Sequence, residues 1–183
     1  MFARTDRLLL RPAWEEDVPA LHAAIGDEGV VRNLARAPWP YRIEDAHAFV
    51  GLARDARLPD FLIFARTHGA PRLIGGVGLA REDNGAVELG YWIARPYWGL
   101  GFATEAARAV VDMADHSLRL PSLVAGHFLD NPASANVLRK LGFRPTGEVF
   151  MRRSLARGRD VACARFVREA GAVGEDSNPA LAA

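Results

Sequence analysis

Hydrophobic residues recur at spacings of three and four in four stretches of the chain, which predicts four amphipathic helices. In the first stretch Val18, Leu21, Ala24 and Ile25 fall on one face. Prolines and glycines close the later ones, as Gly142 does after the last, so helix ends can be placed. The predicted helices are Trp14–Ile25, Ile43–Arg57, Thr104–Leu118 and Pro132–Leu141.

Short apolar runs between turn residues predict the strands. The triplet Asp83-Asn84-Gly85 tolerates positive φ and predicts a hairpin turn. Residues Gly26–Arg42, with two prolines, read as an irregular connection. A meander that leads into alternating strands and helices indicates a mixed sheet covered by helices, an α+β or α/β fold. The predicted strands are Asp6–Pro12, Phe61–Thr67, Leu73–Ala80, Ala86–Ile93, Leu123–Phe128, Phe143–Met151 and Val161–Arg168.

Length and composition indicate one domain. The chain has 183 residues, half of them hydrophobic, which is ample for a single core. No repeat or linker interrupts the order of predicted helices and strands before Ala170, and from Ala170 onward the sequence shows no such pattern. We therefore expect one domain over residues 1–169 and a disordered tail over residues 170–183.

Charge and cysteine content exclude several classes. The formal net charge is +1, so we expect no direct nucleic-acid binding and no attraction to anionic lipid. The longest charge-free stretch, Leu120–Leu129, is too short for a membrane span of about 20 residues, and the N-terminus lacks a signal-peptide pattern. Cys163 is the only cysteine and the histidines show no metal spacing, which predicts no metal site and a cytoplasmic protein.

The segment Glu88–Glu105 carries the most chemical information. It predicts a strand, a turn with Gly99 and Gly101, and a helix. The first amide groups of a helix have no intrahelical partner and attract anions, and two glycines with the small Ala103 would let a phosphate approach them. The plain alternative is a tight strand–helix turn.

Two familiar phosphate loops do not fit this segment. Thr104 stands where a dinucleotide-binding fingerprint needs its third glycine, and the segment follows a meander instead of opening a βαβ unit. A nucleotide triphosphatase loop needs a lysine, whereas the one lysine of the chain is Lys140. The segment therefore disfavours a nicotinamide dehydrogenase and excludes a P-loop enzyme.

Two motifs resemble a known family. The runs Glu88–Ile93 with Tyr97–Ala106, followed by Asn131–Phe143, resemble the GNAT N-acetyltransferases, and within them the RimJ and RimL type that acetylates ribosomal-protein N-termini. The likeness spans Thr5–Arg168. It implies a mixed, mostly antiparallel sheet of about seven strands, splayed between strands four and five and flanked by about four helices. It also implies acetyl-CoA as cosubstrate.

The resemblance implies a set of cofactor-binding residues. Its pyrophosphate loop falls on Trp98, Gly99, Leu100, Gly101, Phe102, Ala103 and Thr104. Trp98 departs from the glutamine or arginine of the wider superfamily, so backbone amides would carry the binding. The pantetheine arm would pair like an added strand with Tyr91, Trp92 and Ile93 and bond to Asn131. Arg95, Arg108 and Arg139 are candidates for the other phosphates or plain surface charges.

The same resemblance implies the catalytic groups. Glu88 matches the general base of this branch, and Ser134 matches the serine that protonates the thiolate or simply hydrogen-bonds its sulfur. An exposed strand glutamate is the alternative for Glu88, and His127 is the reserve base, unless it is a plain sheet residue. We expect the oxyanion donor to be the backbone N–H of Trp92 or Ile93.

The sequence says least about the acceptor, the amine that would receive the acetyl group. Trp39 and Tyr41, with Glu88, are predicted to shape its pocket; Trp92 is a pocket or a core residue. Cys163 falls in a core strand, which disfavours an acetyl-cysteine route and favours direct transfer in a ternary complex. An α-amine with a pKa near ~7.8 is about 10% unprotonated at pH 7, so a weak base suffices, and a protein N-terminus is the leading acceptor.

Two alternatives to acetylation of a protein N-terminus stay open, and so does pairing with a second copy of the chain. A small amine such as an aminoglycoside, polyamine or amino acid is the nearest rival, and for polycations an acidic pocket would be needed. A non-catalytic sensor of acetyl-CoA is a rival of another class. A homodimer is possible. The residues that could form such an acidic pocket are Asp27, Glu28, Glu44 and Asp45.

Overall fold

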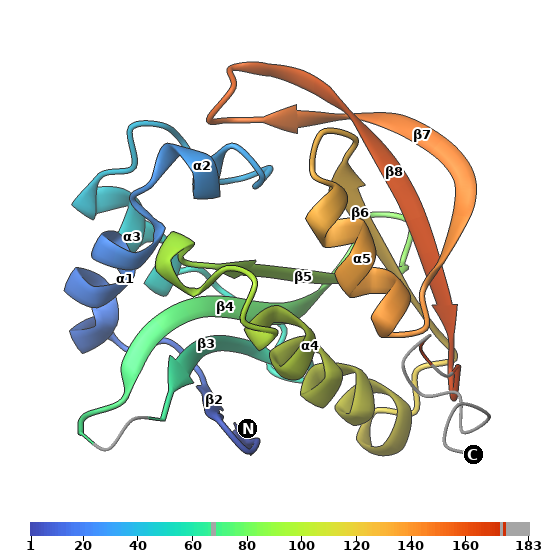
Figure 1. The fold of residues 1–183 in the computed structure, drawn as a ribbon, viewed down its shortest axis with the longest axis horizontal. Helices are drawn as coiled ribbons and strands as arrows, with labels where there is room; N and C mark the ends of the chain where they lie inside the picture. Colours follow the sequence, from blue (N-terminus) through green and yellow to red (C-terminus); the bar gives the residue numbers. More distant parts are fainter. Residues whose placement is uncertain (67–68, 173, 175–183) are drawn as a thin grey trace.

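The computed structural model describes residues 1–66, 69–172 and 174. Over these residues the chain forms one mostly antiparallel sheet in the order β1-β2-β3-β4-β5-β6-β8-β7 (Figure 1). The strands are β1 (Ala3–Arg4), β2 (Leu8–Arg11), β3 (Asp60–Ala65), β4 (Arg72–Arg81), β5 (Val87–Ile93), β6 (Ser122–Phe128), β7 (Arg144–Ser154) and β8 (Arg159–Glu169). The expected mixed sheet is confirmed, with the two-residue β1 added at one edge.

Helices cover both faces of the sheet. The α-helices are α1 (Val18–Ile25), α2 (Glu28–Val31), α3 (Ile43–Val50), α4 (Phe102–Asp112) and α5 (Pro132–Lys140). The last turns of α4 run on as a π-helical segment, Met113–Ser117, so the predicted helix to Leu118 is nearly complete. The single turn of α2 lies inside the stretch expected to be irregular.

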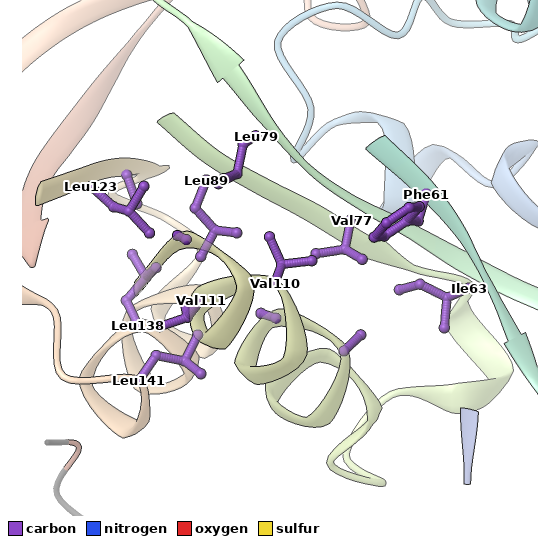
Figure 2. Close-up of a cluster of buried hydrophobic side chains, with 14 of the residues drawn as sticks. Phe61, Ile63, Val77, Leu79, Leu89, Val110, Val111, Leu123, Leu138 and Leu141 are labelled. Carbon is purple, nitrogen blue, oxygen red and sulfur yellow. The ribbon is translucent and has the colours of Figure 1, made fainter. Parts of the chain in front are cut away.

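Strand β3 shows how the two layers are divided. Phe61 and Ile63 are buried in the cluster that packs against α4 and α5, and Leu62 and Phe64 are buried in the cluster with α1 and α3. Side chains alternate across a strand, so a continuous apolar run indicates a strand covered on both sides. Figure 2 shows Val77 and Leu89 of the neighbouring strands grouped around Val110 of α4 in the larger cluster.

Helix α3 ends earlier than predicted. The pattern favours a helix to Arg57, whereas α3 ends at Val50 with Gly51 as its C-cap. The reason is a competing side-chain donor, because the Arg54 guanidinium donates to the carbonyls of Phe49, Val50 and Leu52. These bonds satisfy the free carbonyls of the helix end and turn the chain away.

The sheet opens between β5 and β6, as expected. β5 is paired with β4 along its whole length, from Val87 to Ile93. Its parallel pairing with β6 is limited to Glu88 and Val124. Beyond that point β6 turns away from β5 (Figure 1). On the side that faces β6, the backbone groups in the C-terminal half of β5 are thus left without a neighbouring strand.

The C-terminal residues divide into two parts. Residues 170–172 were expected in the tail, yet they are fixed by hydrogen bonds from Ala170 N–H to Pro121 O, from Gly171 N–H to Asp115 and from Arg168 to Ala172 O. Residues 170–172 are therefore bonded to the rest of the domain. Residues 173 and 175–183 of the predicted tail lie outside the described residues.

Candidate active site

The turn between β5 and α4 has the geometry of an anion site. Gly99 and Gly101 have φ values of +74° and +80°, in the left-handed region that favours glycine. Gly101 is the N-cap of α4 and has no side chain to bond the first amides. A Cβ at Gly99 would meet nothing within 4 Å. A Cβ at Gly101 would meet Arg7 Nη2 at 3.5 Å, so the amides of Phe102, Ala103 and Thr104 begin α4 without a side-chain cap and beside a guanidinium, which suits a diphosphate.

Arg7 is a cation at this turn that the sequence analysis missed. Its Nη1 donates to Leu100 O at 3.0 Å and its Nε to Glu105 at 2.6 Å. The guanidinium also lies 4.4 Å from the centre of the Phe102 ring. Nothing local in the sequence signals this contact, because Arg7 comes from the turn before β2. Arg7 therefore places a guanidinium, paired with Glu105, beside the turn.

Glu105 does not oppose anion binding, since its charge is compensated. Thr5 and Arg7 both donate to its carboxylate. Burial on its own would raise the pKa of Glu105, but these hydrogen bonds and the Arg7 charge together hold that pKa below its usual range. The first turn of α4 thus carries the Arg7–Glu105 ion pair instead of an unpaired carboxylate.

Trp98 has a structural role in the turn. Its indole Nε1 donates to Ile93 O at 2.7 Å, which ties the end of β5 to the loop. The ring is 47% exposed and approaches Gly29 of α2. The Ile93 carbonyl is therefore already engaged by the protein.

The register of β5 decides which backbone groups face the opening. Ala94 N–H donates to Ile74 O on β4, and antiparallel bonding alternates between successive residues. By this alternation the amide of Trp92 points to Gly76 on β4, while the amides of Tyr91 and Ile93 point to the splayed side. Of the two expected oxyanion donors, only the Ile93 N–H faces the opening.

Tyr91 and Ser134 meet across the gap between β5 and α5. The Tyr91 hydroxyl lies 2.8 Å from Ser134 Oγ and 3.1 Å from Ser134 O. Burial raises the pKa of the Tyr91 phenol, partly offset by the Ser134 hydrogen bond. Ser134 is held at the start of α5 by Asn131, whose side chain accepts from its backbone N–H. Asn131 is thus the N-cap of α5.

Glu88 lies on the opposite side of β5 in a network of four charges. Arg152 of β7 donates to its Oε1 at 2.6 Å. Arg152 also approaches Glu82, which accepts from Arg165 of β8 at 2.7 Å. The Arg165 hydrogen bond lowers the pKa of Glu82, against the effect of burial. Glu88 is therefore a carboxylate fixed by β7, not a free strand glutamate.

A small cavity of about 40 Å³ lies beside this network. It is lined by Asn33 and Ala35 after α2, by residues 126–128 of β6, by Arg152 and by Cys163. This volume holds a few waters or an amino group with a short substituent. Burial raises the pKa of the Cys163 thiol to about 11, so it is protonated at neutral pH and unsuited to carry an acetyl group.

Among the other predicted residues, His127 is one of those that line the cavity, whereas Tyr41 and Trp39 are not. The His127 ring packs against Phe166 in the core on the α5 side, with Nδ1 2.8 Å from Phe128 O. Tyr41 is buried among α1 and α3, stacks on His22, and has a pKa raised by burial to about 12. Trp39 is 41% exposed and does not line this cavity.

The candidate phosphate-binding arginines differ in their contacts. Arg95 lies 3.5 Å from Asp27 beside Trp98 and Gly29, close to the turn. Arg108 donates to Lys140 O and Arg139 to Asn136, both on α5. All three arginines have neighbours within the protein, and Arg7 is the one that contacts the turn itself.

Within residues 1–66, 69–172 and 174, no group of three or more His, Cys, Asp or Glu side chains could hold a metal ion. No helix among those same residues is long and apolar enough to cross a bilayer.

Comparison with known proteins identifies relatives of this chain. Residues 7–144 match the model of the acetyltransferase (GNAT) domain. The uncharacterized N-acetyltransferase YoaA of Bacillus subtilis is 33% identical over 150 residues, which cover 78% of this chain and 82% of YoaA.

Two solved structures share the fold. Apo RimL, the ribosomal L7/L12 α-N-protein acetyltransferase, superimposes with a TM-score of 0.76 at 22% identity, over 92% of this chain and 94% of that one. Spermidine N-acetyltransferase from Vibrio cholerae, in complex with CoA and spermine, gives 0.72 at 18% identity, over 92% and 98%. These two neighbours have different acceptors, so the fold by itself does not select one.

Proposed function

Because this chain belongs to the GNAT acetyltransferases and is an N-acetyltransferase, we propose that it transfers the acetyl group of acetyl-CoA directly to the N-terminal α-amine of a protein. The diphosphate binds the turn between β5 and α4, and the pantetheine arm lies along the unpaired half of β5. Tyr91 and Ile93 offer backbone groups on that side, with Asn131 at its end.

The two catalytic groups act from opposite faces of β5. Side chains three positions apart on a strand project to opposite sides, and here Glu88 contacts Arg152 while Tyr91 contacts Ser134. Glu88 accepts the proton of the amine, directly or through a water, on the side of the small cavity. Ser134 donates a hydrogen bond to the departing sulfur on the other side. The Ile93 N–H stabilises the acetyl oxygen as it gains negative charge.

The observation that carries the choice of acceptor is the charge of the cavity. Its one charged lining side chain among the described residues is Arg152, already paired with Glu88. Of the acidic residues that could select a polycation, Asp45 caps α3 and Asp27 pairs with Arg95. Glu28 and Glu44 are exposed at the starts of their helices, and none of the four lines the cavity. A cationic polyamine would find little attraction here, whereas a single α-amine fits.

Thiol release from acetyl-CoA with a panel of acceptors tests this proposal. We expect turnover with short peptides that have a free α-amine, and little with the same peptides blocked at the N-terminus or with spermidine. The opposite order, spermidine or aminoglycosides above every free peptide, would assign the enzyme to small amines.

Substitution of Glu88 tests its role as base. Glu88→Gln removes the proton acceptor, so kcat/KM should fall by about tenfold or more at pH 7 and recover above about pH 8, where an α-amine is mostly unprotonated. Glu82→Gln is the matched control, because it alters the same arginine network without removing the base. Equal effects of both variants at every pH would show that Glu88 is structural.

A further inference from the structure

Three segments distant in sequence lie around the small cavity beside Arg152, which the proposed function takes as the acceptor site. The turn after β7 is joined to the segment after α2, because Leu155 N–H donates to Ala35 O at 3.0 Å and Arg157 Nε donates to Arg32 O at 2.8 Å. Arg157 also makes a two-bond pair with Asp130, in the turn after β6, at 2.7 and 3.0 Å. Ala35 and Phe128, which line the cavity, belong to two of these segments. We call this surface the rim, defined as residues 32–36, 127–131 and 152–160.

The rim is much more basic than the protein as a whole. It contains six arginines and two aspartates, whereas the whole chain has a formal net charge of only +1. Arg32 and Arg157 share the single carboxylate of Asp130. Arg153 is 3.9 Å from Asp160, and both side chains are mostly exposed. Arg152 is paired with Glu88, which lies outside the rim, and the other five arginines still exceed the two aspartates around the cavity.

Two of the rim arginines are free to meet a ligand. Arg36 follows directly on Ala35, and Arg159 pairs with Ser154 across the hairpin that contacts Ala35. Both are exposed, and no ion pair joins either to another residue in the part of the chain that the structure describes. Both guanidinium charges are therefore exposed on the rim and are not used to hold the β7–β8 hairpin in place.

We infer that the preferred acceptor carries acidic residues directly after its N-terminal amine. This inference rests on the proposed function, in which the amine enters the cavity beside Glu88. The cavity is too small for more than the first residue. The next residues of an extended peptide advance by about 3.3–3.6 Å each, so positions two to four cross the rim. Aspartate or glutamate there meets an excess of arginine, and arginine pairs well with carboxylates.

Three peptides of one length, each beginning with serine, test the inference. Positions two to four are glutamate in the first, glutamine in the second and lysine in the third. We measure kcat/KM for each at saturating acetyl-CoA. Two or three exposed charge pairs of ordinary strength give about a tenfold preference for the glutamate peptide over the glutamine peptide, and the lysine peptide should be poorest. The preference should shrink as salt is raised from about 0.02 to 0.5 M.

A double variant locates the preference on the rim. Arg36→Gln with Arg159→Gln should bring the glutamate-to-glutamine ratio close to one. The matched control is Arg119→Gln with Arg144→Gln, which removes two exposed arginines near the other end of β6 and β7. It should keep the full ratio. Thermal unfolding of both variants shows whether either is misfolded.

The outcomes separate this inference from the proposed function. If all three peptides are acetylated equally, or the lysine peptide is best, the inference is wrong and the proposed function stands. If no peptide is acetylated but spermidine is, both are wrong. If a short single-stranded RNA inhibits acetylation of the glutamine peptide and the peptides show no charge preference, the rim is a nucleic-acid surface and the inference is again overturned.

Discussion

At the scale of single residues, the site depends on pairs that fix each reacting group. Glu88 is held by Arg152, and Ser134 is held by Asn131 and Tyr91. The Tyr91 phenol can donate to Ser134 Oγ or to Ser134 O. When it donates to Oγ, the serine proton is left free to point at the departing sulfur. Tyr91 is thus a positioning residue that acts through Ser134.

Removal of the Tyr91 hydroxyl tests this role. Tyr91→Phe keeps the buried ring but loses one hydrogen bond, worth about 0.5–1.5 kcal/mol, so kcat should fall about threefold to tenfold with little change in the KM for acetyl-CoA. In a Ser134→Ala background the same substitution should have no further effect, which a double-mutant cycle measures. If Tyr91→Phe lowers kcat equally in the parent protein and in the Ser134→Ala variant, Tyr91 does not act through Ser134.

At the scale of elements, the turn from β5 to α4 combines local and distant contributions. Gly99 and Gly101 supply the left-handed backbone, and the helix start supplies amides. Arg7, from the turn before β2, supplies positive charge and holds the carbonyl of Leu100. The backbone shape of the turn therefore comes from its own glycines, and the guanidinium beside it comes from Arg7 before β2.

Loss of the Arg7 charge should weaken cofactor binding. For Arg7→Gln we expect the Kd for CoA and the KM for acetyl-CoA to rise by about fivefold, the scale of one exposed charge contact, with kcat little changed. Arg4→Gln is the control, since Arg4 is an exposed arginine on neighbouring β1. Calorimetry with CoA gives the Kd of each variant. Equal affinities for the two variants would mean that Arg7 does not contribute to the site.

At the scale of the whole molecule, ion pairs connect segments that the sheet brings together. Arg168 of β8 pairs with Asp115 at the end of the helical layer, and Arg157 joins the β7–β8 turn to Asp130. Hydrogen bonds from Arg157 lower the pKa of Asp130, against the effect of burial. Burial raises the pKa of Asp115, but the Arg168 and Gly171 hydrogen bonds leave it below its usual range.

These shifts predict acid-sensitive stability. A carboxyl whose folded pKa is lowered stabilises the protein above its unfolded pKa, and that stabilisation is lost as pH falls through the folded pKa. The unfolded values are near 4, so the unfolding temperature should drop steeply below about pH 4. Asp115→Asn should be less stable than the parent at pH 7, and the difference should narrow in acid. A constant difference from pH 7 to pH 3 would show that Asp115 contributes no charge-dependent stability. The other carboxyls with lowered pKa values are Asp17, Glu82 and Glu105.

The sequence by itself determined the features that depend on near neighbours. The order of helices and strands and the glycine-containing turn between β5 and α4 follow from residues a few positions apart. The opening between β5 and β6 followed from the family resemblance and is confirmed.

Only the tertiary structure decided which distant side chains meet. Arg7 and Glu105 are 98 positions apart, Glu88 and Arg152 are 64, and Tyr91 and Ser134 are 43. Tyr41, predicted at the acceptor pocket, is buried between α1 and α3, because those helices pack on the face of β3 that carries Leu62 and Phe64. Spacing along the chain fixes the face of an element on which a residue lies, but the order and register of the strands decide what that face meets.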